Sequence, residues 1–198
     1  MCDADDRQLI TQIKAGQREA LRQLVEKYKK PLYRVCFNMT GNHRDAEDIS
    51  QETFIKVYQK IDQFRMDSRL LTWIYRIAAN TYIDRKRKKI LDTIPIETPG
   101  SVETKTGFEP VSNDTNLHPE SHIESEMIQK HINHALNQLS PREKTAFVMK
   151  HYDDLTIKEI AGIINTTEGT VKSLLFRAVR KMQSALSFYR NELGLEDV

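Results

Sequence analysis

Cysteine, glycine and long apolar runs are all scarce in this chain of 198 residues. The 2 cysteines cannot build a disulfide framework, and the apolar spacing around Cys36 predicts that it is a small buried residue. No apolar run approaches the ~20 residues that span a bilayer. The first turns are acidic rather than basic and apolar, unlike a secretion signal. These absences predict a cytoplasmic protein without membrane insertion.

Catalytic and cofactor-binding motifs are missing as well. No glycine-rich phosphate loop, nucleophile elbow or catalytic triad stands out, so we expect no enzyme activity, cofactor or metal. One alternative is a metal-dependent hydrolase, because histidines and glutamates gather at i,i+3 and i,i+4 spacings, although neither HExxH nor paired-cysteine spacing is present. The residues of this alternative are His118, Glu120, His122, Glu124, Glu126, His131 and His134.

The net charge of only +2 hides an uneven distribution along the chain. Residues 1–91 carry 19 basic and 12 acidic side chains, whereas residues 92–126 carry 1 and 8. Four of the 6 prolines fall between residues 92 and 122, where no hydrophobic period remains. We therefore predict a flexible acidic linker at 92–122 between a domain at 1–91 and a domain at 123–198.

Apolar residues at helical spacing fill most of the remaining sequence, and strand alternation is absent. The pattern predicts an all-α protein with two small helical bundles joined by the linker. The expected helices are about 5–15, 17–40, 44–62, 69–90, 122–139, 141–152, 156–164 and 168–189.

The helix expected at 69–90 has two distinct sides. Leu70, Ile74 and Thr81 belong to an apolar stripe, whereas Trp73, Arg76, Asn80 and other polar residues lie on the other side. The helix runs into a basic segment at 85–89. A tryptophan beside an arginine and an amide offers a base a stacking surface, a phosphate a cation and a base edge a hydrogen-bonding group. A solvated helix with a core tryptophan is the alternative interpretation.

The second domain carries a predicted helix-turn-helix. Capping boxes at Ser140 and Thr156 mark two helix starts, and Asn165 can take a left-handed conformation in the turn before residue 168. From Gly169 to Arg190 the chain has five basic side chains and no acidic one. A short helix, a tight turn and a longer basic helix is the geometry that inserts a recognition helix into the DNA major groove.

Three sequence blocks together resemble one family. Residues 155–161, 168–173 and 177–178 together resemble region 4 of the extracytoplasmic-function (ECF) sigma factors of the sigma-70 superfamily. Residues 45–54 resemble their region 2.2, and residues 72–80 resemble the helix that they use on the minus-ten promoter element. The blocks stand in the order and spacing of the family. The resemblance implies a sigma factor that binds core RNA polymerase, recognises both promoter elements and promotes melting.

The region 2.2 resemblance implies docking on a coiled coil of the polymerase's largest subunit. The polar side of this helix offers Asp48, Gln51, Glu52 and Lys56, which suit arginines of a partner. Without the flanking blocks, a solvated helix start would explain the acids equally well. The apolar residues expected mostly to pack inward are Ile49, Phe54, Val57, Tyr58 and Ile61.

The resemblance also assigns promoter contacts. The loop at 64–68 becomes part of a pocket for a base flipped from the nontemplate strand. The residues expected on the minus-ten element are Phe64, Arg65, Ser68, Trp73, Arg76, Asn80, Arg85, Arg87 and Lys88. Those expected on the minus-thirty-five duplex are Glu168, Gly169, Thr170, Lys172, Ser173, Phe176, Arg177 and Lys181.

Two residues depart from the family pattern near the recognition helix. Leu174 stands where arginine is usual, and Phe176 replaces a frequent histidine, which affects promoter sequence rather than function class. The resemblance further implies contact with the polymerase flap and an anti-sigma factor that covers these surfaces. A stand-alone helix-turn-helix regulator is the alternative function, but it leaves the Trp73 face and the basic 85–89 segment unexplained.

Overall fold

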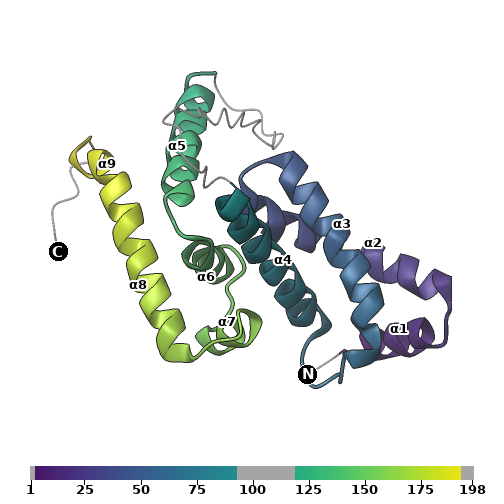
Figure 1. The fold of residues 1–198 in the computed structure, drawn as a ribbon. Coiled ribbons are helices and arrows are strands. Elements are labelled where there is room, and N and C mark those ends of the chain that lie inside the picture. Colours follow the sequence, from purple (N-terminus) through teal and green to yellow (C-terminus); the bar gives the residue numbers. More distant parts are fainter. Residues whose placement is uncertain (1–2, 93–118, 193–198) are drawn as a thin grey trace.

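The computed structural model describes residues 3–92 and 119–192. Within these ranges the chain is helical throughout its regular elements and contains no strand, so the predicted all-α class is confirmed. Helices α1–α4 form one bundle and α5–α9 the other (Figure 1). Most of the linker predicted at 92–122 lies outside the described residues. None of the helices in the described part is long and apolar enough to cross a membrane.

The N-terminal bundle is built from four α-helices and one 3-10 turn, close to the predicted ranges. Helix α3 packs on α2, and α4 packs on both. A glycine at φ 78° ends α2, because Gly41 takes the left-handed conformation without a Cβ clash. The elements are α1 (Ala4–Lys14), α2 (Arg18–Thr40), α3 (His43–Lys60), η1 (Ile61–Gln63) and α4 (Leu70–Asp92).

The C-terminal bundle contains three local features that the sequence predicted. Ser140 and Thr156 both form complete capping boxes, with Glu143 and Glu159 returning hydrogen bonds to the cap backbone. Asn165 has φ 51°, as its place in the turn predicts. The elements are α5 (Pro119–Asn137), α6 (Pro141–His151), α7 (Ile157–Ile163), α8 (Glu168–Ala185) and α9 (Ser187–Glu192).

Two helix boundaries of the C-terminal bundle were predicted wrongly. Helix α5 begins at Pro119, inside the linker predicted to run to residue 122. The helix expected at 168–189 ends at Ala185, and α9 follows after Leu186. The break lets aromatic side chains of α9 reach α5, where the Tyr189 hydroxyl lies 2.6 Å from Nδ1 of His131. The Phe188 ring also meets His131 edge-on at 5.0 Å. These tertiary contacts override the helical propensity of the segment.

The core is continuous across the two bundles. The predicted stripe of α4 is buried, with Leu70 and Ile74 fully inaccessible. The same apolar cluster also includes Met149 of α6 and Ile160 of α7, and α4 contacts both helices (Figure 1). The sequence pattern predicted two separate bundles and did not predict that they would share a core. Cys36 is fully buried as predicted, and burial raises the pKa of its thiol to about 11.

Candidate functional site

The exposed side of α4 carries two residues predicted to contact DNA. Arg76 and Asn80 are exposed and lie one helical turn apart. The buried stripe on the opposite side fixes the rotation of the helix, so this side faces solvent. A guanidinium and an amide in one row can follow the phosphates and base edges of a single strand.

Trp73 lies beside this exposed row and is half-buried. Its ring centroid is 5.0 Å from that of Phe64, with the planes tilted by 39°. The Phe64 side chain is only 3 % exposed. It packs against the Trp73 ring and has almost no surface left for contact with DNA. This burial does not fit the expected direct contact of Phe64 with DNA. In the same loop Arg65 is exposed and Ser68 is half-buried.

An ion-pair network joins α4 to α3. The Nε of Arg85 donates to Glu52 at 2.8 Å, and the Lys56 ammonium lies 2.7 Å from the same carboxylate. Lys56 also donates to the Thr81 hydroxyl at 3.0 Å. Burial works to raise the pKa of Glu52, but hydrogen bonds from Lys56 and Arg85 lower it overall. Arg85 was predicted to contact DNA, whereas Glu52 and Lys56 were predicted to contact core polymerase. In this structure the three side chains pair with one another.

Two further basic residues near the end of α4, Arg87 and Lys88, were predicted to contact DNA. Arg87 lies 3.4 Å from Asp84 in an exposed pair, which costs little to break. Lys88 is exposed. Both cations therefore face solvent near the exposed row of α4.

The outward face of α3 is more apolar than predicted. Asp48 and Gln51 are exposed, and one and two turns further on Ile55 and Tyr58 are 58 % and 57 % exposed. The prediction that Tyr58 packs inward is wrong. Val57 is fully buried, and the next residue is rotated by about 100° around the helix, which turns Tyr58 toward solvent.

A groove of about 400 Å³ runs between α2 and α3 beside this face. Sequence reasoning missed it, because its walls come from two helices whose register only the fold determines. Gln51 is the one residue of the groove that was predicted to bind a partner. The lining residues are Val25, Lys29, Lys30, Tyr33, Glu47, Ser50, Gln51 and Phe54.

Helices α7 and α8 form the predicted helix-turn-helix. The Thr167 side chain caps α8 by accepting from the Thr170 amide at 3.2 Å. Lys172, Ser173 and Phe176 are exposed on the following turns, and Phe176 is 64 % exposed. Near the cap, Glu168 and Gly169 are exposed. Most of the residues predicted for duplex contact therefore share one open surface.

Leu174 explains one departure from the family pattern. It is 5 % exposed and belongs to the core, so the side chain at this position cannot reach DNA.

On the exposed side of α8, the Arg180 guanidinium lies 5.8 Å from the centre of the Phe176 ring. This cation–π contact holds a positive charge next to an exposed aromatic ring.

Two residues predicted to contact the minus-thirty-five duplex, Arg177 and Lys181, form ion pairs within the C-terminal bundle. The carboxylate of Glu143, on α6, accepts hydrogen bonds from Arg177 at 3.1 Å and Lys181 at 2.7 Å. Burial works to raise the pKa of Glu143, but hydrogen bonds from Lys181, Ser140 and Arg177 outweigh it and lower that pKa to about 2. Sequence reasoning placed Glu143 only in a capping box.

The described residues give no support to the hydrolase alternative. They contain no group of three or more His, Cys, Asp or Glu side chains that could hold a metal ion. His131 is engaged with Tyr189, and His118 lies outside the described residues.

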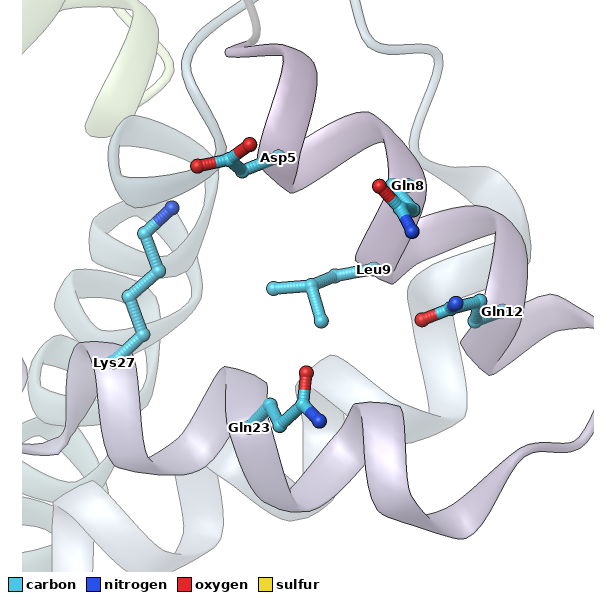
Figure 2. Close-up of a pocket in the computed structure, with 6 residues that line it drawn as sticks. All are labelled: Asp5, Gln8, Leu9, Gln12, Gln23 and Lys27. Atoms are coloured by element: carbon cyan, nitrogen blue, oxygen red, sulfur yellow. The ribbon is translucent and has the colours of Figure 1, made fainter.

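A polar groove of about 540 Å³ separates α1 from α2 (Figure 2). Gln8 and Gln12 on α1 face Gln23 on α2 across Leu9, as Figure 2 shows. The ammonium of Lys27, at one edge, is held 2.7 Å from the buried Asp6. The groove contains none of the residues predicted to bind DNA or polymerase.

Comparison with known proteins defines the class of this fold and site. The Sigma-70 region 2 family matches residues 24–90, and the Sigma-70 region 4 family matches residues 130–182. The chain is 36 % identical over 177 residues to the ECF RNA polymerase sigma factor SigW of Bacillus subtilis, covering 89 % of this chain and 94 % of the relative. It is 31 % identical over 178 residues to the ECF RNA polymerase sigma-E factor of Escherichia coli K12, with coverages of 87 % and 90 %.

Solved structures share the fold. The sigma factor RpoE in complex with the anti-sigma factor NepR, from Bartonella quintana, matches with a TM-score of 0.59 at 23 % identity, covering 84 % of this chain and 96 % of that one. CnrH in complex with the cytosolic domain of CnrY matches with a TM-score of 0.62 at 19 % identity, with coverages of 92 % and 97 %. The two family matches and the relatives at 36 % and 31 % identity define the class as the sigma-70 superfamily. Within it, the chain belongs to the ECF family of RNA polymerase sigma factors.

Proposed function

We propose that the exposed row of α4 binds the melted nontemplate strand of the minus-ten element. Arg76 and Asn80 contact phosphates and base edges, and Trp73 stacks at the edge of the bubble with Phe64 behind it. The loop residues Arg65 and Ser68 border the pocket of a flipped base. Extruding a base costs a few kcal/mol, which stacking and edge contacts offset. Differential binding to the open strand shifts the melting equilibrium without nucleotide hydrolysis.

The basic end of α4 adds phosphate contacts. Arg87 and Lys88 face solvent, and Arg87 exchanges its exposed pair with Asp84 for a phosphate at little cost. Arg85 must first leave Glu52, so its contribution to DNA binding is smaller.

The recognition helix α8 reads the minus-thirty-five duplex. Lys172, Ser173 and Phe176 enter the major groove, where the phenyl ring can meet a thymine methyl. Thr170 and the cap residues Glu168 and Gly169 approach the strand from the N-terminus of α8. Arg177 and Lys181 reach phosphates when DNA competes with Glu143 for them.

The outward face of α3 docks on the largest subunit of core polymerase. Asp48 and Gln51 supply the polar contacts, and the exposed Ile55 and Tyr58 supply apolar area next to them. Glu52 and Lys56, which form an ion pair with each other in the free chain, also belong to this interface. An interface with an apolar centre and a charged rim is the usual architecture of a specific protein complex.

Further assignments follow from the sigma factor family. The chain acts as a dissociable initiation subunit without an active site of its own, in the cytoplasm, and its C-terminal bundle meets the polymerase flap. An anti-sigma factor holds it inactive, by analogy with the sigma factor RpoE, whose solved structure is a complex with the anti-sigma factor NepR.

One observation carries the proposal: a single chain exposes Arg76 and Asn80 beside Trp73 on α4 and a second row of DNA-binding side chains on α8. The test is transcription by purified chain with bacterial core polymerase on a pool of genomic promoter fragments. We expect discrete start sites only when the chain is present. Specific DNA binding without core association and without new starts would favour the stand-alone regulator instead.

A matched pair of variants sharpens this test. Asn80→Ala removes an amide from the exposed row of α4, whereas Gln23→Ala removes an exposed amide from α2, away from the proposed DNA and polymerase surfaces. Loss of the new starts with the first variant and their retention with the second would tie initiation to the α4 row.

A further inference from the structure

A lysine of the first helix supports the loop between η1 and α4. Helix α1 packs against η1, at the end of α3 where the chain turns toward α4 (Figure 1). The ammonium of Lys14, in the last turn of α1, donates to the carbonyl oxygen of Asp62 at 3.2 Å and to that of Phe64 at 3.4 Å. The joined residues are 48 and 50 positions apart in the chain, and sequence reasoning gave Lys14 no role.

The two carbonyl groups need a donor because the 3-10 turn ends there. Element η1 covers Ile61–Gln63, and Phe64 follows it in an extended conformation. The last carbonyl groups of a helical turn have no partner within that turn, and a lysine side chain is one of the groups that can satisfy them. Lys14 therefore caps η1 from another helix and fixes the point at which the loop at 64–68 begins.

Few other contacts hold this loop. Within the part of the chain that the structure describes, residues 65–68 form no hydrogen bond. Met66 has a left-handed conformation with φ 59°, which is unfavourable for a residue with a Cβ, and its half-buried side chain packs on the core. The loop is thus held by the apolar side chains of Phe64 and Met66 and by the polar contact of Lys14.

The contact of Lys14 also leads to the tryptophan of α4. The residue whose carbonyl accepts from Lys14, Phe64, has its ring 5.0 Å from the ring of Trp73. A shift of the Phe64 backbone would move both its ring and the start of the loop. Trp73 and the loop are the parts of the N-terminal bundle that we propose meet the edge of the bubble and the flipped base. Their relative position consequently depends on an ammonium that comes from α1.

We propose that Lys14 is a positioning residue for minus-ten recognition, which holds the loop at 64–68 in the shape that accepts one flipped base and rejects the others. This inference rests on the proposed function of α4. Lys14 acts through the backbone of Phe64 and does not itself contact DNA. A pocket discriminates between bases when its walls keep their place, because a displaced wall lets the wrong base find other contacts. A loop held in its bound shape also loses less conformational entropy when the base enters.

The position of the loop can be followed in the free chain through Trp73, the single tryptophan of the sequence. Lys14→Met keeps an unbranched side chain and removes the ammonium, and because Lys14 is exposed the helix should stay folded, as circular dichroism verifies. We expect acrylamide to quench Trp73 more strongly in this variant. Lys14→Arg can donate to both carbonyl groups and should retain the wild-type quenching. Arg7→Met, which removes a cation from an exposed position two turns earlier in α1, is the matched control.

Base discrimination is the decisive measurement. Holoenzyme with each variant opens versions of one active promoter that carry each of the four bases at every minus-ten position. At a single position, that of the flipped base, Lys14→Met should lower the preference for the best base about 3- to 10-fold, the range that corresponds to a lost hydrogen bond. Preferences at the other positions should stay as in wild type. Lys14→Arg and Arg7→Met should match wild type throughout.

A purely structural role of Lys14 gives a different result. Loss of folded chain does not depend on the base, so Lys14→Met would then lower opening on all promoter versions alike, which would overturn the positioning role. Unchanged base preferences in Lys14→Met, with or without a change in the quenching of Trp73, would overturn it as well. The same would follow from an equal loss of preference in Arg7→Met.

Failure of the proposed function can be told apart from failure of this role. In the first case holoenzyme with the wild-type chain opens no promoter, and the positioning role falls together with the function. In the second case the wild-type chain opens promoters with a strong base preference that Lys14→Met retains, which overturns the role of Lys14 alone.

Discussion

The ammonium of Lys181 lies 2.7 Å from the carboxylate of Glu143, which also accepts a hydrogen bond from Arg177 at 3.1 Å. Two cations of the recognition helix are therefore anchored to α6. This arrangement fixes the angle of α8 on its bundle and also sets a competitor against DNA phosphate. Stability and DNA binding are consequently coupled at this carboxylate, and variants here must be measured for both.

Acid should weaken the C-terminal bundle through Glu143. Its pKa of about 2 lies below the unfolded value of 4.5, so the stabilisation is complete above about pH 4.5 and is lost as the pH falls through about 2. Glu143→Gln should therefore cost about 1–3 kcal/mol of unfolding free energy at pH 7, and less as the pH is lowered toward 3. Denaturant unfolding at a series of pH values measures this difference. Glu168→Gln, at an exposed position, serves as the control, and an equal loss in both variants would contradict the role of Glu143.

Arg177 and Lys172 should separate anchoring from DNA binding. Both Arg177→Ala and Lys172→Ala should weaken holoenzyme binding to minus-thirty-five duplex, and each should lower the slope of log K against log salt by up to about 0.9. Only Arg177→Ala should also lower the melting temperature, because it leaves Glu143 without one partner. Salt titrations and thermal unfolding of the same preparations provide the data. Unchanged salt slopes in both variants would remove these residues from the DNA interface.

Asn80→Ala should impair promoter opening and spare duplex binding. The side chain is exposed on α4, so its loss leaves the core intact, and its proposed contacts exist only with unpaired bases. Losing one such hydrogen bond should lower the open fraction about 5- to 10-fold, as read by permanganate reactivity of unpaired thymines. Gln23→Ala, at an exposed amide of α2, should leave both steps unchanged. Equal losses in duplex binding and opening would refute the division of labour between α4 and α8.

Tyr58→Ser should weaken association with core polymerase. The ring is 57 % exposed on α3 in the free chain, and burial of an aromatic at an interface centre contributes about 1–2 kcal/mol, or 5- to 30-fold in Kd. Fluorescence anisotropy of labelled chain with core measures the change. Tyr152→Ser, at a site 40 % exposed outside the proposed docking face, is the matched control. Identical affinities for the Tyr58 variant and wild type would place the docking surface elsewhere.

Local signals made much of the fold predictable from the sequence. The capping boxes at Ser140 and Thr156 gave correct helix starts, and Asn165 marked the turn between α7 and α8. Hydrophobic period gave the buried stripe of α4, with Leu70 and Ile74 inside. Such features depend on neighbours a few residues away, which is the range over which sequence patterns carry structural information.

Features that depend on tertiary packing were not predictable. The end of α8 depends on aromatic contacts between Tyr189 and His131, which are 58 residues apart. The outward rotation of Tyr58 follows from the phase that Val57 sets in the core. Sequence reasoning did not single out Tyr75, which is 3 % exposed and whose hydroxyl lies 3.5 Å from Asp153 of the second bundle. The resemblance named the candidate DNA contacts but not the intramolecular partners of Arg85 and Arg177, since those depend on charges brought together by folding.

The shared core has a consequence for protein engineering. A hybrid that joins the N-terminal half of one family member to the C-terminal half of another would treat the halves as interchangeable modules. In this chain Met39 and Arg34 fit against Thr145 and Asp153. A foreign C-terminal half would bring different side chains to these positions, so its hybrids would differ in activity even with both DNA-reading helices intact. Transferring these residues together with α6–α8 would preserve the contacts between the two halves in such hybrids.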